Sequence, residues 1–184
     1  LSSSRGWFLF RYFGHNNILI IKGGLKNWKN CNGAVSNEKI NPVQGDFEAN
    51  MERKELVVNL DQMISESKNN SKLILDARSE KRYLGEAKEP RPELPSGHIP
   101  NSKSLPASDL ISSNGYLKSL EELNEYFLNK NINNKDDIIA TCGSGVSACV
   151  ISIALYCLGK EDVPIYDGSW TEWASSGQEI KTSI

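Results

Sequence analysis

The sequence is poor in the residues that bind metals or cross-link small proteins. Its 184 residues include four cysteines and two histidines. None of the cysteines forms a Cys-x-x-Cys pair, so the sequence indicates neither a zinc site nor a disulfide framework, and we expect no metal and no cofactor. Unpaired thiols are typical of a reducing compartment, so we expect a cytoplasmic protein, or a mitochondrial one if the organism is eukaryotic.

An excess of one charge and long apolar runs are also missing. Lys and Arg total 21 and Asp and Glu total 23. Nucleic-acid and membrane partners would favour a strong basic excess on some segment, so we expect neither partner. No apolar run approaches the roughly 20 residues that a membrane span needs. The longest run, 148–158, has polar interruptions and fits a buried helix better. The chain begins at Leu1 rather than Met, and no signal peptide is visible.

The first 50 residues predict part of one domain and a linker. Residues 3–13 predict an apolar helix ended by Gly14, residues 17–24 (NILIIKGG) a strand with its turn, and residues 25–31 a short helix with Trp28 on its inner face. Helix, strand and helix cannot close a core alone, so residues 1–32 are expected to be the C-terminal part of an N-terminal domain. Residues 33–50 are polar, with Gly, Pro and Asn, and predict an interdomain linker.

Residues 51–184 predict a second, complete α/β domain. Strands are expected at 73–76, 102–105, 137–141 and 164–168, and helices at 60–68, after the capping box Ser119-x-x-Glu122, and from Val146 to Gly159. The proline-rich stretch 79–101 predicts a stiff, irregular excursion. Strands alternating with helices imply a parallel sheet covered on both faces, in which ligands bind at the carboxyl ends of strands. Cys142 is expected at such an end.

The segment that follows Cys142 suits a reactive thiol. A thiolate is the nucleophilic form of cysteine, and backbone N–H groups at a helix N-terminus stabilise an anion. Gly143 and Gly145 would let the segment 142–147 (CGSGVS) curl so that successive N–H groups form a nest with room for a second sulfur atom. The alternative is a buried structural cysteine whose glycines only make a turn. Because Cys-Gly-x-Gly follows a predicted strand and precedes a predicted helix, we favour a reactive-thiol site over a structural cysteine.

Two other kinds of site fail on spacing. A Cys-x5-Arg phosphatase needs Arg at the position of Ala148, and the chain has no Gly-Lys-Ser/Thr of a Walker A loop. Cys149 and Cys157 fall inside the apolar helix and are expected in the core. Arg78, His98 and His15 are expected to be structural, with His98 fixing a loop by hydrogen bonds.

Four motifs together resemble the two-domain rhodanese family, and within it the 3-mercaptopyruvate sulfurtransferase branch. CGSGVSAC (142–149) is similar to the family's active loop, and the segment 76–106, which begins DARSEKRYLG, to the part that carries its substrate arginines. YDGSWTEWAS (166–175) is similar to its C-terminal signature, and residues 5–28 to the second half of its N-terminal domain. The resemblance implies a rhodanese-like fold with a parallel central sheet and helices on both faces.

The resemblance also implies sulfur transfer. Cys142 would attack the donor sulfur, become a persulfide and release pyruvate, and a thiol such as thioredoxin, or cyanide, would then accept the outer sulfur. Arg82 and Arg91 map to the family's donor-binding arginines, and a planar guanidinium suits a carboxylate. Ser144 is implied to be catalytic, and the remaining loop residues to bind the donor: Gly143, Gly145, Val146 and Ser147.

The resemblance leaves alternatives open. Ser144 is typical of the mercaptopyruvate branch, whereas the thiosulfate branch carries basic residues in this loop. A thiosulfate sulfurtransferase and a non-catalytic rhodanese-like binding module remain as other hypotheses, although the intact Cys142 speaks against the module. In the family a His and an Asp join the serine in a relay. They match neither His15 nor His98, and we expect them before Leu1.

Overall fold

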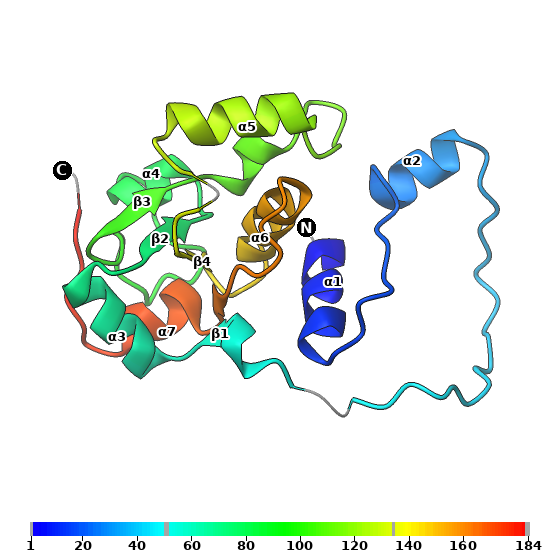
Figure 1. Ribbon diagram of the computed structural model, residues 1–184, viewed down its shortest axis with the longest axis horizontal. Helices are drawn as coiled ribbons and strands as arrows, with labels where there is room; N and C mark the ends of the chain where they lie inside the picture. Colours follow the sequence, from blue (N-terminus) through cyan, green and yellow to red (C-terminus); the bar gives the residue numbers. More distant parts are fainter. Residues whose placement is uncertain (1, 50–51, 134, 183–184) are drawn as a thin grey trace.

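A parallel five-stranded sheet forms the centre of the molecule (Figure 1). The structure is a computed structural model that describes residues 2–49, 52–133 and 135–182, so the predicted domain boundary between residues 50 and 51 lies outside the described residues. The strands pair in the order β1-β5-β4-β2-β3, and every pair is parallel. Their bounds are β1 (Val57–Val58), β2 (Leu73–Asp76), β3 (Ser102–Ser104), β4 (Ile138–Thr141) and β5 (Ile165–Tyr166).

Helices lie on both faces of this sheet, as the sequence predicts (Figure 1). The α-helices are α1 (Ser2–Tyr12), α2 (Gly24–Asn30), α3 (Leu60–Asn69), α4 (Glu80–Leu84), α5 (Leu120–Asn129), α6 (Ala148–Cys157) and α7 (Ser169–Ser175). Two 3-10 turns, η1 (Lys54–Leu56) and η2 (Ala107–Leu110), complete the elements of the described residues. Asn59 and Ser119 cap α3 and α5 through capping boxes, and the second of these confirms the predicted one.

Neighbouring residues of the central strands pack on opposite sides of the sheet. Leu75 and Ala140 belong to the core cluster that includes residues of α1, α5 and α6. Ile74 and Ile139 belong to the cluster formed with α3 and α7. Because β2 and β4 are buried from both sides, their sequences are almost continuously apolar, as expected for parallel strands.

The N-terminal residues follow the prediction only in part. α1 is confirmed, and its Trp7 and Phe8 are 6% and 2% exposed in the same core cluster as α6. The strand predicted at 17–24 is wrong, since no strand forms there and Leu19 is 92% exposed. Trp28 of α2 does not face a core, because it is 41% exposed and donates from Nε1 to the carbonyl of Ala34.

Two further differences concern short elements. α4 begins inside the stretch predicted to be irregular, after Ser79 and before Gly85, whose positive φ ends the helix. Cys149 is buried as predicted, whereas Cys157 is exposed at the end of α6, which corrects its expected place in the core. Across the described ranges, no helix has both the length and the apolar character needed to cross a membrane.

Candidate functional site

The segment 142–147, called the thiol loop below, leaves the carboxyl end of β4 and leads into α6. Cys142 is 1% exposed. Gly145 has a φ of +72°, and a Cβ atom on it would lie 2.8 Å from Oδ1 of Asp167. A larger residue would therefore be strained and crowded at this position. The expected placement of the cysteine, at a strand end and before a helix, is confirmed.

Ser169 is a part of the site that sequence reasoning missed. Its buried hydroxyl accepts the N–H groups of Cys142 at 3.3 Å and Gly145 at 2.9 Å, and it donates to the carbonyl of Tyr166. The same oxygen lies 3.8 Å from Sγ of Cys142. Two loop N–H groups that were expected to face the sulfur therefore bind the Ser169 hydroxyl instead. Ser169 stabilises the curled backbone of the loop through these two hydrogen bonds.

Ser169 adopts a strained backbone conformation to reach the loop. Its φ is +52°, in the left-handed region that non-glycine residues rarely adopt. Such strain persists where surrounding contacts fix it, often at functional sites. Here the next residues of α7 supply these contacts: Trp170 N–H binds the carbonyl of Cys142, and Thr171 N–H binds that of Gly143. α7 therefore sets the shape of the thiol loop.

A pocket of about 440 Å³ opens beside the thiol loop. It brings together most of the residues predicted for the site, although Gly145 is buried and is not among the described lining residues. The lining consists of Arg82, Glu89, Pro90, Arg91, Leu94, Cys142, Gly143, Ser144, Val146 and Ser147. The thiol, the neutral loop and the two predicted arginines thus share one cavity, while the role of each residue stays a prediction.

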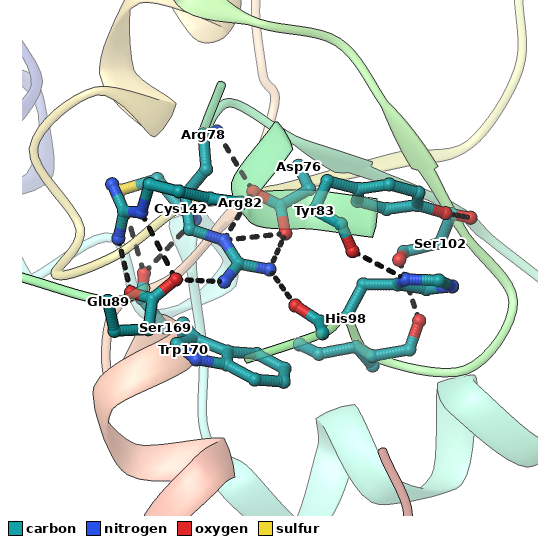
Figure 2. Close-up of polar contacts among 12 residues, drawn as sticks. Asp76, Arg78, Arg82, Tyr83, Glu89, His98, Ser102, Cys142, Ser169 and Trp170 are labelled. Atoms are coloured by element: carbon teal, nitrogen blue, oxygen red, sulfur yellow. Dashed lines mark hydrogen bonds and ion pairs between the residues drawn. The ribbon is translucent and has the colours of Figure 1, made fainter. Parts of the chain in front are cut away.

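A chain of ion pairs connects the sheet to Arg82 (Figure 2). Arg78 is buried and pairs with Asp76 at the end of β2 and with Glu89. Glu89 in turn binds Nε and Nη2 of Arg82. A buried charge left without a partner is costly, so this arrangement fixes the Arg82 guanidinium against the pocket, 3.1 Å from the place where a Cβ on Gly143 would lie.

Arg78 also explains how the proline-rich stretch is held. Its Nη2 donates to the carbonyl of Gly97, and its guanidinium lies 4.3 Å over the ring of Trp170. The Nδ1–H group of His98 donates to the carbonyl of Tyr83 at 2.8 Å, and the His98 ring stacks on the Tyr83 ring (Figure 2). Burial lowers the pKa of His98, which favours the neutral ring there. The structural roles predicted for Arg78 and His98 are confirmed.

Arg91 differs from Arg82 because it is exposed at the rim of the pocket. Its Nη1 donates to Oγ1 of Thr171 at 2.8 Å, and this hydroxyl donates to the carbonyl of Gly143 at 2.7 Å. Arg91 has no carboxylate partner among the described residues, so its charge is available to an anion. The pocket therefore offers one neutralised and one available guanidinium next to a thiol.

A second cysteine contacts the thiol loop from α6. Cys149 lies on α6 and its Sγ donates to the carbonyl of Gly145 at 3.3 Å. Burial raises the pKa of Cys149 to about 12, against a smaller opposite effect of Arg5. A thiol with this pKa is almost fully protonated at neutral pH and is a poor nucleophile. No cluster of three or more potential metal ligands occurs within the described ranges.

Comparisons with known proteins agree with this geometry. The sequence profile of the family described as "Rhodanese-like domain" matches residues 57–176. The 3-mercaptopyruvate sulfurtransferase of Homo sapiens is 38% identical over 94% of this chain and 58% of its own length. The thiosulfate sulfurtransferase of Cricetulus griseus is also 38% identical, over 92% of this chain and 57% of its own length.

A solved structure of a rhodanese-fold protein is also similar to this chain. The crystal structure of SseA from Escherichia coli, described as a 3-mercaptopyruvate sulfotransferase with the rhodanese fold, has a TM-score of 0.79 and 33% identity. It aligns with 92% of this chain and 62% of that chain. The chain spans slightly under three fifths of the length of the two curated relatives. Because the matched residues contain the whole sheet, the thiol loop and both arginines, the chain belongs to the rhodanese-like domain family.

Proposed function

We propose that the protein is a sulfurtransferase that takes a sulfur atom from 3-mercaptopyruvate, carries it as a persulfide on Cys142 and gives it to a thiol or to cyanide. The observation that supports this most directly is the pocket that contains Cys142, the neutral thiol loop and two arginines. A thiol at the end of a parallel strand and before a helix is placed for nucleophilic attack. The names of the relatives support sulfur transfer as the class of reaction.

The proposed first step is an attack on sulfur. The Cys142 thiolate forms a bond to the sulfur of 3-mercaptopyruvate while the carbon–sulfur bond breaks. The electron pair passes to the carbon as the enolate of pyruvate, which takes a proton and leaves as pyruvate. Cys142 keeps the sulfur as a persulfide. No external oxidant is needed, because the two electrons that the sulfur atoms give up on forming the persulfide reduce the donor carbon, which becomes the methyl group of pyruvate.

The second step returns the enzyme to its starting state. An acceptor thiolate attacks the outer sulfur, the sulfur–sulfur bond of the persulfide breaks, and the Cys142 thiolate leaves. With cyanide the product is thiocyanate. We propose a small thiol or thioredoxin as the acceptor, since the opening of the pocket lies at the exposed residues Ser144 and Val146 of the thiol loop.

The charges of the pocket favour a donor with a single carboxylate. Glu89 neutralises Arg82, so the three charged lining residues together carry one net positive charge, which matches a monoanion. Ser144 adds no charge at the loop, whereas a dianion such as thiosulfate would favour more basic residues. An Arg91 guanidinium can bind a carboxylate through two parallel hydrogen bonds. We therefore propose 3-mercaptopyruvate over thiosulfate as the donor.

One experiment separates the proposed function from its alternatives. The chain is incubated with 3-mercaptopyruvate or thiosulfate, freed of donor and weighed by mass spectrometry. A gain of one sulfur atom with the organic donor, together with pyruvate release, supports the proposal. A gain with thiosulfate alone would instead make the protein a thiosulfate sulfurtransferase. No gain with either donor would contradict sulfur transfer and favour a binding module.

A further inference from the structure

A side chain from α1 contacts the thiol loop from behind. Arg5 lies 140 positions before Gly145 in the chain, and its Nη1 donates to the Gly145 carbonyl at 3.3 Å. The same nitrogen donates to Oδ1 of Asp167 at 2.6 Å, and the Arg5 side chain is 25% exposed. The ion pair with Asp167 holds the guanidinium in place, so the hydrogen bond to the loop requires little further ordering of a long side chain.

Gly145 is held through both of its backbone polar groups. Its N–H binds the hydroxyl of Ser169, and its carbonyl accepts from Arg5 and from Sγ of Cys149. Its φ of +72° places it in a conformation that glycine adopts easily and can also leave easily. A residue with this freedom keeps one orientation only if its surroundings fix it, and Arg5 is the charged group that does so.

The orientation of the Gly145 carbonyl determines where the next N–H group points. A trans peptide is planar, so the carbonyl of Gly145 and the N–H of Val146 point in opposite directions. With the carbonyl turned to Arg5, the Val146 N–H points away from α1. Val146 lines the same pocket as Cys142. In general, a backbone N–H that faces a sulfur anion stabilises its negative charge, and small changes in such donors have large effects on rate.

We propose that Arg5 is a positioning residue for the Cys142 thiolate: by holding the Gly145 carbonyl, it keeps the Val146 N–H directed to the sulfur. The proposal rests on the proposed function, because it concerns the same thiol. It assigns to α1, outside the segment matched by the family profile, a direct part in the reactivity of the loop. Arg5 is not among the residues that line the pocket with Cys142, so its effect on that thiol passes through Gly145.

The test compares two arginines of the same helix. Arg5→Gln removes the bond to the loop. Arg11→Gln is the matched control, because Arg11 also anchors α1 to the domain, through the carbonyl of Glu161 at 2.8 Å and the ring of Tyr156. Both variants lose one positive charge from α1 and keep an aliphatic stem. Arg5→Lys restores one donor and the charge. All are made in the full 1–184 chain.

Two measurements report on the loop. The rate of Cys142 alkylation by iodoacetamide against pH gives the apparent pKa of the thiol, and steady-state kinetics with 3-mercaptopyruvate gives kcat and KM. Arg5→Gln is expected to raise the apparent pKa by about one unit, as expected for the loss of one oriented donor to an anion. It is expected to lower kcat about tenfold at nearly constant KM, and Arg5→Lys to recover most of the loss.

Arg11→Gln is expected to lower the free energy of unfolding without moving the alkylation profile. An equal shift of the profile in both variants would show that docking of α1, rather than the bond to Gly145, controls the thiol, and would overturn the proposal. An unchanged profile in Arg5→Gln would overturn it as well. If the unmodified chain accepts no sulfur from any donor, the proposed function fails, whereas the alkylation profile still decides the role of Arg5.

Discussion

The rhodanese-like domain and the segment 15–49 use apolar residues in opposite ways. In the domain, Ile74 and Ile139 of the central strands are 0% and 1% exposed. In the segment, Leu19 and Val43 are 92% and 91% exposed. The run 18–21 (ILII) consists of Ile and Leu alone and is at least as rich in them as β2 or β4, yet no strand of the described residues pairs with it. Apolar content alone therefore does not determine a strand, because the backbone of a strand needs a partner.

α1 shows that the burial of apolar residues depends on the elements they can pack against and not on their position in the chain. It lies before the exposed segment, but it packs beside α6 (Figure 1). Arg11 stacks between the rings of Trp7 and Tyr156, at 4.7 Å and 4.6 Å from their centres. The comparison therefore divides the chain into a packed unit that includes α1 and a mostly exposed connection that contacts this unit at Ile18 and Asn27. Changes at exposed positions of the connection should have much smaller effects than changes in the packed unit.

The largest effect is expected at the centre of the packed unit. Cys142→Ser should abolish persulfide formation, because serine lacks the thiolate that attacks the donor sulfur. Mass spectrometry after donor treatment should show no added sulfur. Cys149→Ser is the matched control, since this buried thiol has a pKa raised to about 12 and should not be loaded. Sulfur found on Cys149 or Cys157 in Cys142→Ser would contradict the assignment.

The next largest effect tests whether α1 belongs to the packed unit. Trp7 is 6% exposed, and its ring meets Tyr156 edge-on at 5.1 Å. Trp7→Ala should lower the free energy of unfolding by about 3–5 kcal/mol, as large-to-small changes in cores do. Urea unfolding measures this value. A loss below about 1 kcal/mol, typical of surface sites, would show that α1 is only loosely attached.

A smaller and more selective effect is expected at the pocket rim. Arg91→Ala should weaken the use of 3-mercaptopyruvate far more than that of thiosulfate, because it removes a charge-assisted bond to a carboxylate that is worth about 1.5–3 kcal/mol. This corresponds to a loss of roughly tenfold to a hundredfold in kcat/KM. Steady-state assays with both donors give the comparison. Equal losses for both donors would show that Arg91 does not bind the carboxylate.

Charge at the thiol loop should have a modest effect on donor choice. Ser144 is exposed and lines the pocket, so Ser144→Lys places one positive charge beside the thiol. The ratio of kcat/KM for thiosulfate to that for 3-mercaptopyruvate should rise about fivefold, since added positive charge favours the dianion. Ser144→Met is the control for side-chain length. A ratio that rises equally in both variants would exclude charge as the selector.

Local sequence patterns were sufficient for the parts of the molecule that depend on neighbours in the chain. β2 and β4, the capping box at Ser119 and the place of Cys142 follow from runs and motifs of a few residues. Arg82 and Arg91 were found through the resemblance and not from any local pattern. Their position in the same pocket as the thiol is a result of the fold.

Two of the residues that sequence reasoning misses act over long distances in the chain. Ser169 reaches the thiol loop from 27 positions away, and Arg5 from 140. A serine in a Gly-Ser-Trp sequence gives no sign that it will accept two N–H groups from another segment. Glu89 was likewise missed, because one carboxylate in a charged loop does not reveal which arginines it will pair with.

The smallest effect on the free energy of unfolding is expected at the exposed positions of the connection. Leu19→Ser should change the free energy of unfolding of the 1–184 chain by no more than about 0.5 kcal/mol, because surface changes away from packed contacts rarely exceed this value. Ile74→Ser, which replaces a fully buried residue of β2, provides the opposite limit. Urea unfolding of both variants measures the difference. A loss above about 2 kcal/mol in Leu19→Ser would mean that Leu19 is buried in solution, and this result would support the strand predicted at 17–24.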